Sequence, residues 1–350
     1  MRVALLIVAS STLGAAACGG EPASTAGFTD PQVIADFADR VVIPTYALLD
    51  ARIDALHAAT VALAATPTAD NLDAAQQAWI AARVPWEQSE AFLFGPVSAR
   101  GYDPALDSWP VERTDLDLVL ASGDALTPAY VRNLPETQKG FHTLEYLLFG
   151  ERRGRQVDEL GERELAYLTA TAAELADISG QLAASWTDGA PSFREVFVGA
   201  GTNSTYPSLD AAAQEILVGM SGICDEVANG KIADPYDAHD PALVESQYSW
   251  NSLADFADNL RSVEQAYLGD VPAAGTTGRG LDAIVAERDP ALDARFRAEL
   301  AAAIAAIGAI PPPFRDAITD PAAYPAIEAA QGAIRTVQAT IDGELTTALR

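Results

Sequence analysis

Apolar residues recur at spacings of three and four along almost every long segment of this 350-residue chain. Alanine is abundant, and runs in which β-branched and polar residues alternate are scarce. The first pattern gathers apolar side chains on one face of an α-helix, whereas a half-buried β-strand needs the alternation that is scarce here. The sequence therefore predicts an all-α fold.

Eight long helices are expected from this periodicity. Their approximate ranges are 31–66, 70–93, 136–149, 158–187, 208–229, 250–268, 289–308 and 321–348. Eight helices suffice for two four-helix bundles. The stretch 188–207 is rich in Gly, Pro, Ser and Thr and is the strongest interior loop signal. We therefore expect an N-terminal bundle at 28–190 and a C-terminal bundle at 208–350. A short similarity between 145–150 and 264–269 is consistent with an internal duplication.

The N-terminus has the layout of a secretory signal sequence. Arg2 precedes an apolar stretch at 3–13, and small residues at 14–17 precede Cys18. We expect cleavage after residue 17, lipidation of Cys18 and a flexible tether at 18–27. A lipidated Cys18 would hold the protein at a membrane surface. Ordinary cleavage without lipid is the alternative, because Ala15 stands where lipoprotein signals usually carry leucine.

The composition limits the possible partners. Removal of residues 1–17 takes away Arg2 alone, so 21 basic and 49 acidic residues remain, a formal charge of −28. Such a charge repels nucleic acid, and no nucleic-acid partner is expected. It would concentrate cations near the protein, although solvation of helix faces is its usual explanation. No later segment has eighteen uninterrupted apolar residues, so no further membrane span is expected.

His142 and Glu145 are the first candidate metal ligands. Residues three positions apart share one face of a helix, so the imidazole and the carboxylate can point at one place. Two ligands are too few for a tight site, and Glu90, Asp115 and Asp117 are the nearest candidate partners in sequence. An imidazole with several carboxylates suits iron, manganese or zinc. A purely structural hydrogen-bonded pair is the alternative, and it is commoner for an isolated His-x-x-Glu.

A zinc-peptidase motif is missing. Both helical versions of that motif combine two histidines with a carboxylate, and Tyr146 stands where the inverted version would carry its second histidine. His57 is expected at a helix surface and His239 in a solvated loop. The sequence also has no phosphate-binding glycine loop and no nucleophile elbow.

The segment Gly140-Phe-His142-Thr-Leu-Glu145, followed by Tyr-Leu-Leu-Phe-Gly150, resembles the Gly-x-His-x-x-Glu signature of the imelysin family, also called imelysin-like or insulin-cleaving peptidases. Other stretches are similar to the family as well. They are 83–92, the triplet Ser108-Trp109-Pro110 with Asp117 eight residues after Trp109, and 245–255. The resemblance spans most of the chain after the signal sequence.

The resemblance implies two related four-helix bundles with the motif near their interface. It also implies a bacterial envelope lipoprotein, on the periplasmic or cell-surface side, that is linked to iron uptake. The metal ligands it implies are His142, Glu145, Glu90 and Asp117. The residues it places around the site or at the domain interface are Gly140, Arg83, Trp109, Glu245, Ser249 and Asn251.

Three functions follow. The favoured one is an envelope-anchored protein that binds a metal ion, with iron first and zinc or manganese as alternatives, and passes it to components of an iron-uptake transporter. The second is a metallopeptidase of the imelysin type, for which the sequence identifies no catalytic residue. The third is a partner-binding module in which the motif is structural.

Overall fold

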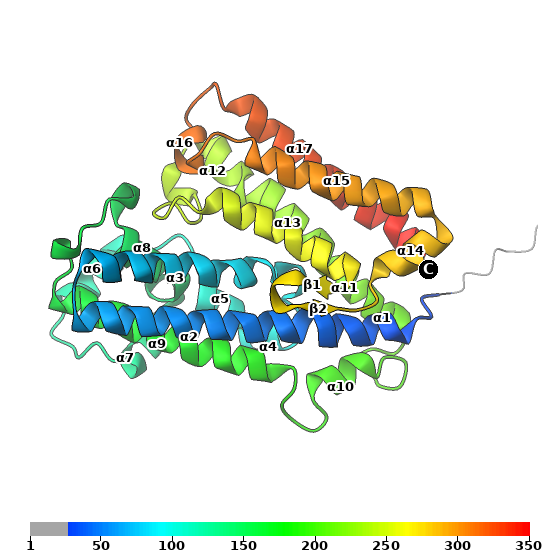
Figure 1. Cartoon of the computed structure of the whole chain (residues 1–350), viewed down its shortest axis with the longest axis horizontal. Helices are drawn as coiled ribbons and strands as arrows, with labels where there is room; N and C mark the ends of the chain where they lie inside the picture. The colour runs from blue at the N-terminus through cyan, green and yellow to red at the C-terminus, as the bar shows by residue number, and fades with distance from the viewer. Residues whose placement is uncertain (1–26) are drawn as a thin grey trace, which may run out of the picture.

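The computed structural model describes residues 27–350, which are predominantly helical (Figure 1). The prediction of an all-α fold is confirmed. The sole sheet of the described residues is a hairpin of β1 (Asp270–Val271) and β2 (Thr276–Thr277). None of the described helices combines the length and the hydropathy that a membrane span requires. The predicted signal sequence, Cys18 and the tether up to residue 26 lie outside the described residues.

One set of long helices comes from the first half of the chain. α1 (Pro31–Asp36), a π-helical turn η1 (Phe37–Val42) and α2 (Ile43–Ala65) form one continuous helix. α2 packs against both α3 (Ala69–Glu87) and α9 (Glu162–Ser185), and α8 (Gly140–Phe149) packs against α3 and α9 in turn. The π-helical turn ends two residues before Pro44, which cannot donate a backbone hydrogen bond.

A second set comes from the other half. α11 (Leu209–Asp225) continues as a π-helical turn η6 (Glu226–Lys231) and packs against α13 (Ser252–Leu268) and α17 (Tyr324–Thr340). α15 (Pro290–Gly308) also packs against α13 and α17. α17 continues through η9 (Ile341–Leu345) into α18 (Thr346–Leu349).

Short helices connect these long ones. They are η2 (Glu90–Phe92), α4 (Pro96–Arg100), α5 (Tyr102–Asp107), α6 (Arg113–Ala121), α7 (Pro128–Arg132), η3 (Glu136–Gln138), η4 (Glu151–Arg153), η5 (Val157–Glu159), α10 (Phe193–Val198), α12 (Ala233–Ala238), η7 (Pro241–Leu243), η8 (Pro272–Ala274), α14 (Leu281–Arg288) and α16 (Phe314–Ala317). Most are too short to show a helical period in the sequence. The expected helix at 70–93 ends early, at Glu87, and the one expected at 136–149 begins at Gly140.

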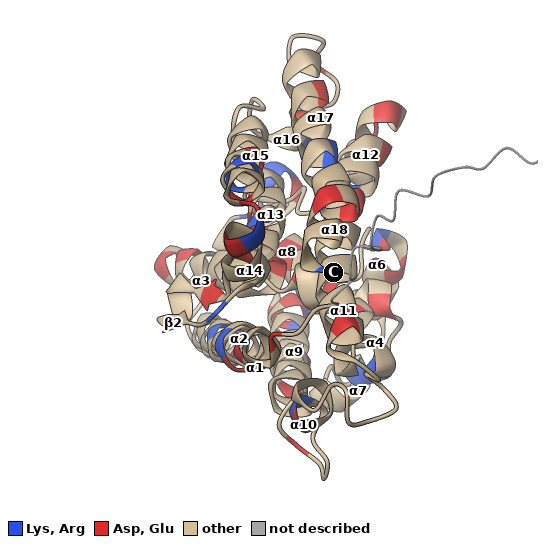
Figure 2. Ribbon diagram, turned by 90° about the vertical axis from the view of Figure 1, so that its right-hand side faces the viewer, with Lys and Arg blue, Asp and Glu red and all other residues tan. Residues whose placement is uncertain are grey.

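The two sets share one contiguous cluster of buried hydrophobic side chains. α11 and α13 pack against η2, and α13 also packs against α3. The domain boundary expected near 190–208 stays a prediction. Asp and Glu residues are spread over helices of both sets (Figure 2), as expected when most acidic residues solvate helix faces.

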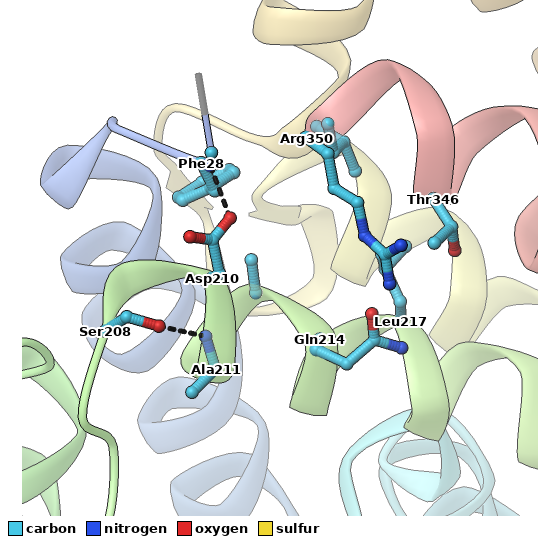
Figure 3. Close-up of a pocket in the computed structure, with 11 residues that line it drawn as sticks. Phe28, Ser208, Asp210, Ala211, Gln214, Leu217, Thr346 and Arg350 are labelled. Atoms are coloured by element: carbon cyan, nitrogen blue, oxygen red, sulfur yellow. Dashed lines mark hydrogen bonds between the residues drawn. The ribbon is translucent and has the colours of Figure 1, made fainter. Parts of the chain in front are cut away.

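The first described residues are fastened to the second set. The Phe28 backbone N–H donates to Asp210 Oδ1 over 2.5 Å, and Ser208 Oγ caps α11 by accepting from the Ala211 N–H over 3.1 Å. A surface cavity of about 430 Å³ lies here, between Phe28 and the C-terminal Arg350 (Figure 3). The first described residue, Gly27, therefore lies beside the start of α11.

Gly219 sets the distance between α11 and η2. A Cβ at this position would lie 2.1 Å from the Ala91 carbonyl oxygen, so the two backbones touch. Gly219→Ala is expected to lower the free energy of unfolding by about 1–3 kcal/mol, because a methyl group here must push the segments apart. Urea unfolding measures the change.

Gly222, three residues further along α11, is the matched control. A Cβ there would meet nothing within 4 Å, so Gly222→Ala is expected to be neutral or to stabilise the helix by up to about 1 kcal/mol. Equal losses in both variants would show that the close approach at Gly219 has no energetic role.

Candidate metal centre

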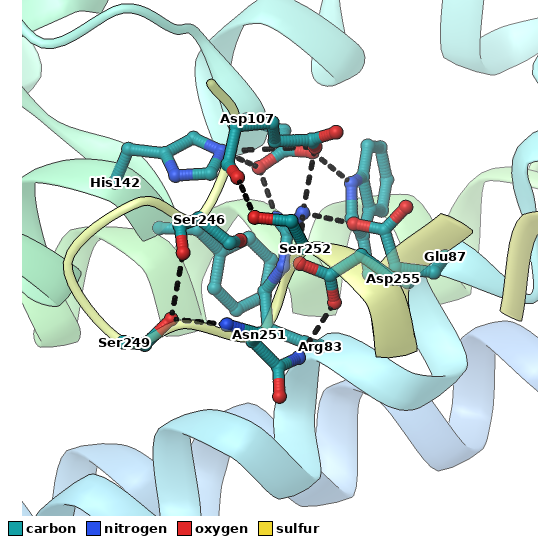
Figure 4. A network of polar contacts seen from close by, with 12 residues as sticks. Arg83, Glu87, Asp107, His142, Ser246, Ser249, Asn251, Ser252 and Asp255 are labelled. Atoms are coloured by element: carbon teal, nitrogen blue, oxygen red, sulfur yellow. Dashed lines mark hydrogen bonds and ion pairs between the residues drawn. The ribbon is translucent and has the colours of Figure 1, made fainter. Parts of the chain in front are cut away.

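Several segments that are far apart in the sequence bring charged side chains to one buried place (Figure 4). α3 contributes Arg83 and Glu87, α5 ends there with Asp107, and α8 contributes His142. Glu245 comes from the loop before α13. The exposed fractions are 0% for Arg83 and Glu245, 2% for His142 and 7% for Asp107, so both helix sets wall the centre off from solvent.

The Arg83 guanidinium lies in the middle of this centre. It donates to Glu87, to Asp107 and, over 2.8 Å, to Glu245 Oε1, and Asp255 Oδ2 lies 3.6 Å away. Burial alone would lower the pKa of Arg83, but these carboxylates raise it well above its usual value. A buried charge without partners costs several kcal/mol, so Arg83 requires the carboxylates around it.

The His142 imidazole faces acidic groups with both nitrogens. Nδ1 lies 3.0 Å from Glu145 Oε2, whereas Nε2 lies 3.1 Å from Asp107 Oδ1 and 3.8 Å from Glu245 Oε1. Nε2 is buried and has no hydrogen bond of acceptable geometry. Ligand atoms of Asp107, His142 and Glu245 all lie within 4.8 Å of one another. One unpaired imidazole nitrogen beside two carboxylates fits a transition-metal ion.

Glu145 stands behind the imidazole. Its Oε1 accepts three hydrogen bonds, from the Tyr248 N–H (2.9 Å), the Ser249 N–H (2.7 Å) and the Ser249 hydroxyl (2.8 Å). Its Oε2 contacts His142 Nδ1. A carboxylate that holds the second nitrogen of a metal-binding histidine orients the ring and fixes its protonation. The structure thus places Glu145 to position His142, whereas the sequence predicted it as a ligand.

Gly140 explains why the motif begins with glycine. Its φ is +77°, and a Cβ would lie 2.4 Å from the Leu106 carbonyl oxygen. Only glycine combines that backbone conformation with such a close approach. The start of α8 therefore lies directly on the end of α5, and this contact brings Asp107 to His142.

A second group of ligand atoms adjoins the first. Oxygens of Glu87, Glu90 and Asp107 also lie within 4.8 Å of one another, and Asp107 belongs to both groups. The Lys231 ammonium lies 3.1 Å from Glu90 and 3.5 Å from Glu87. Glu90 is therefore close to the centre, with a lysine as its direct partner.

The sequence and the fold are similar to those of known proteins. The imelysin family profile matches residues 42–341 of this chain. The chain belongs to the imelysin family. Iron-regulated protein A of Synechococcus elongatus is 33% identical over 335 residues, which cover 94% of this chain and 88% of that protein.

Two solved structures have the same fold. A protein named as an iron-regulated protein A precursor, from Parabacteroides distasonis, superposes with a TM-score of 0.84 at 30% identity, and the match covers 93% of this imelysin and 97% of that chain. An imelysin-like protein from Psychrobacter arcticum gives a TM-score of 0.75 at 16% identity and covers 93% and 98%. The imelysin-like fold is therefore shown.

Two residues expected near the metal lie elsewhere in this imelysin. Asp117 is exposed on α6 and belongs to neither group of ligand atoms, so Asp107 replaces it as the aspartate beside His142. Trp109 is half-buried between α5 and α6 and, among the described residues, makes no polar contact with the centre.

Asn251 supports the centre from outside, since its Nδ2 donates to Asp255 Oδ1 over 2.7 Å. Asp115, another candidate partner, accepts a hydrogen bond of 3.2 Å from Gln138.

The buried charges of the centre do not balance. Six carboxylates are buried here and face only two permanent cations, Arg83 and Lys231. The six are Glu87, Glu90, Asp107, Glu145, Glu245 and Asp255. Burial raises the pKa of Glu87 and Glu90 well above the usual range. Protons on these carboxyl groups therefore reduce the negative charge, and a further cation that entered the centre would displace such protons.

His142 responds to this excess of negative charge. Burial alone would lower the pKa of His142, but Asp107 and Glu145 raise it well above the usual value. A metal ion at Nε2 must displace the proton held there, so metal binding is expected to release protons.

Asp103, one turn before Asp107 on α5, gives a pH-dependent stability. Burial and the neighbouring Asp107 carboxylate raise the pKa of Asp103 to about 6, from the usual 3.8. The folded state therefore prefers the protonated carboxyl. This contribution to stability is present below about pH 4 and is lost as the pH rises through about 6.

Asp103→Asn removes this titration. Without added metal, the variant is expected to exceed the wild type in free energy of unfolding by at most about 3 kcal/mol at pH 8, and to match it at pH 4. Urea unfolding at the two pH values in the presence of EDTA measures the difference. An equal effect of Asp103→Asn at pH 4 and pH 8 would contradict the proposed titration.

Proposed function

We propose that this protein is an envelope-anchored lipoprotein that binds one metal ion, iron foremost, between Asp107, His142 and Glu245, and that it takes part in iron uptake. The observation that carries the proposal is His142 Nε2, which is buried, makes no hydrogen bond of acceptable geometry and faces two carboxylates. The buried carboxyl groups around it, which can release protons to a metal ion, support the same conclusion. In this proposal the protein carries the ion and passes it to components of an iron-uptake transporter.

The donor atoms alone do not distinguish iron from manganese or zinc. The preference for iron comes from the names of the relatives. One imidazole with carboxylate oxygens suits iron, manganese and zinc alike, and the absence of sulfur ligands disfavours copper(I). Two relatives, at 33% and 30% identity, carry the name iron-regulated protein A. Zinc and manganese remain the alternative ions.

The two helix sets support a further proposal, an origin by duplication of a four-helix bundle. The similar segments 145–150 and 264–269 both lie at the C-terminal end of a helix, in α8 and in α13. Each helix is followed by a glycine with positive φ, +62° at Gly150 and +73° at Gly269. Both helices also supply residues to the centre, His142 from α8 and Asp255 from α13.

Burial of the centre favours binding over peptide hydrolysis. A hydrolytic metal site needs an open coordination position and a general base within reach of the substrate. Here the three proposed ligands are at most 7% exposed, and His142 is the sole histidine among them. A peptidase and a partner-binding module are the alternative functions, and the metal titration and the peptide-cleavage assay described next distinguish them.

Calorimetric titration with ferrous iron (under argon), ferric iron, zinc and manganese tests the proposal. The protein without its first 18 residues keeps every residue that the structure describes. One ion per chain is expected, with no binding by His142→Ala/Glu145→Ala, because the double variant loses a ligand and its support. Equal binding by both proteins, or binding by neither, would contradict a metal site at the motif.

Matched variants sharpen this result. Asp107→Asn is expected to abolish binding, and Asp117→Asn, which alters an exposed aspartate, is expected to leave it unchanged. Glu145→Gln keeps all three ligands and is expected to weaken binding by about 10- to 100-fold, as for other residues that orient a ligand. Metal-dependent cleavage of a peptide that is lost in Asp107→Asn would instead support the peptidase.

Attachment to the membrane has a separate test. Cys18→Ser is expected to move the protein from the membrane fraction to the soluble fraction of the producing bacterium and to abolish incorporation of labelled fatty acid, because the acylated thiol is lost. Metal binding by the purified protein should not change. Retention of the variant in the membrane fraction would argue against a lipid anchor at Cys18.

A further inference from the structure

Lys231 occupies a position that resembles a metal site. Its Nζ lies 3.1 Å from Glu90, 3.2 Å from Glu245 and 3.5 Å from Glu87, and the residue is 1% exposed. The chain has only two lysines, Lys231 and Lys139, among its 22 basic residues. A lysine ammonium is a compact point charge, unlike the flat guanidinium of arginine, so it resembles a bound cation.

A local irregularity of the helix directs this lysine inward. α11 continues beyond Asp225 as the π-helical turn η6, and π-helical turns often occur at functional sites. Within this turn Lys231 points into the protein, whereas the Glu226 side chain is 54% exposed and lies 3.9 Å from Nζ. Glu226 therefore marks the solvent side of the lysine position.

Two of the carboxylates around Lys231, Glu87 and Glu90, form with Asp107 a group that meets the same geometric condition as the group at His142. Oxygens of Glu87, Glu90 and Asp107 lie within 4.8 Å of one another. Asp107 belongs to both groups, and Glu245 also contacts both sides, with Oε1 3.8 Å from His142 Nε2 and Oε2 3.2 Å from Lys231 Nζ. Glu245 Oε2 is buried without a hydrogen bond of good geometry. The arrangement is that of two adjoining cation positions with shared carboxylates.

We propose that Lys231 is a built-in cation that fills the second of these positions and so limits the centre to one metal ion. The proposal rests on the proposed function, because it takes the position at His142 as the first metal site. Loss of the ammonium leaves Glu87, Glu90 and Glu245 without their cation. A divalent ion that prefers oxygen ligands, such as Mn²⁺, would then bind in its place.

Calorimetric titration with Mn²⁺ tests the inference through stoichiometry. Wild-type protein is expected to bind one Mn²⁺ and Lys231→Met two. Lys139→Met is the matched control, because Lys139 is also buried, at 6% exposed, but contacts Glu136 and the Arg132 carbonyl outside the centre. It is expected to bind one Mn²⁺. Unchanged stoichiometry in Lys231→Met would overturn the proposal.

Removal of the first position separates this inference from the proposed function. His142→Gln is expected to bind no Mn²⁺, and His142→Gln/Lys231→Met is expected to bind one. If the wild type binds none while Lys231→Met binds one, the proposed function fails and the role of Lys231 stands. If the wild type binds one Mn²⁺ and Lys231→Met also binds one, the proposed function stands and the role of Lys231 fails.

Folding of the variant has its own control. Loss of a buried ammonium among carboxylates destabilises the folded state, and Mn²⁺ is expected to raise the melting temperature of Lys231→Met more than that of the wild type. If Lys231→Met does not fold, Lys231→Gln carries the test, because its amide still donates hydrogen bonds to the carboxylates. A second Mn²⁺ is expected there too, and an unchanged count would overturn the proposal.

Discussion

A single buried guanidinium organises the centre of this protein. Arg83 has no access to water, so its charge must be met by carboxylates. These come from α3, from the end of α5, from the loop before α13 and from α13 itself. Truncation of such a group would leave several carboxylates buried without a partner. The pairing of Arg83 with Glu245 and Asp255 also ties the first helix set to the second, so the same interaction that builds the centre joins the two halves of the chain.

The carboxylates that surround Arg83 exceed what it can neutralise, and the surplus gives the centre its chemistry. Lys231 meets part of the surplus, and His142 holds a proton between Asp107 and Glu145. A metal ion at His142 Nε2 would take over the charge of that proton. Because the side chains involved are almost inaccessible, each cation here acts in a medium of low dielectric constant, where its interaction with a carboxylate is strong. This physical situation suits tight binding of one ion.

The sequence predicted the long helices well, because each has enough turns to show its apolar period. It identified His142, and the family resemblance added Arg83, Glu90 and Glu245. Asp107 was missed because it ends a six-residue helix without a recognisable period, and its contact with His142 depends on the close packing of Gly140 on Leu106. Lys231 was missed because a π-helical turn, invisible in the apolar spacing, directs it inward. The positions of Asp107 and Lys231 in the centre both depend on tertiary contacts between segments that are distant in the sequence.

Anomalous diffraction from crystals grown with iron is the measurement that tests the central claim most directly. The account predicts one strong peak at the iron absorption edge, within about 2.0–2.3 Å of His142 Nε2 and of oxygens of Asp107 and Glu245, the range of metal–nitrogen and metal–oxygen bonds in proteins. Lys231 should keep its ion pairs with Glu90 and Glu87 in that crystal. A peak at any other place, or iron-loaded crystals with none beside His142, would contradict it.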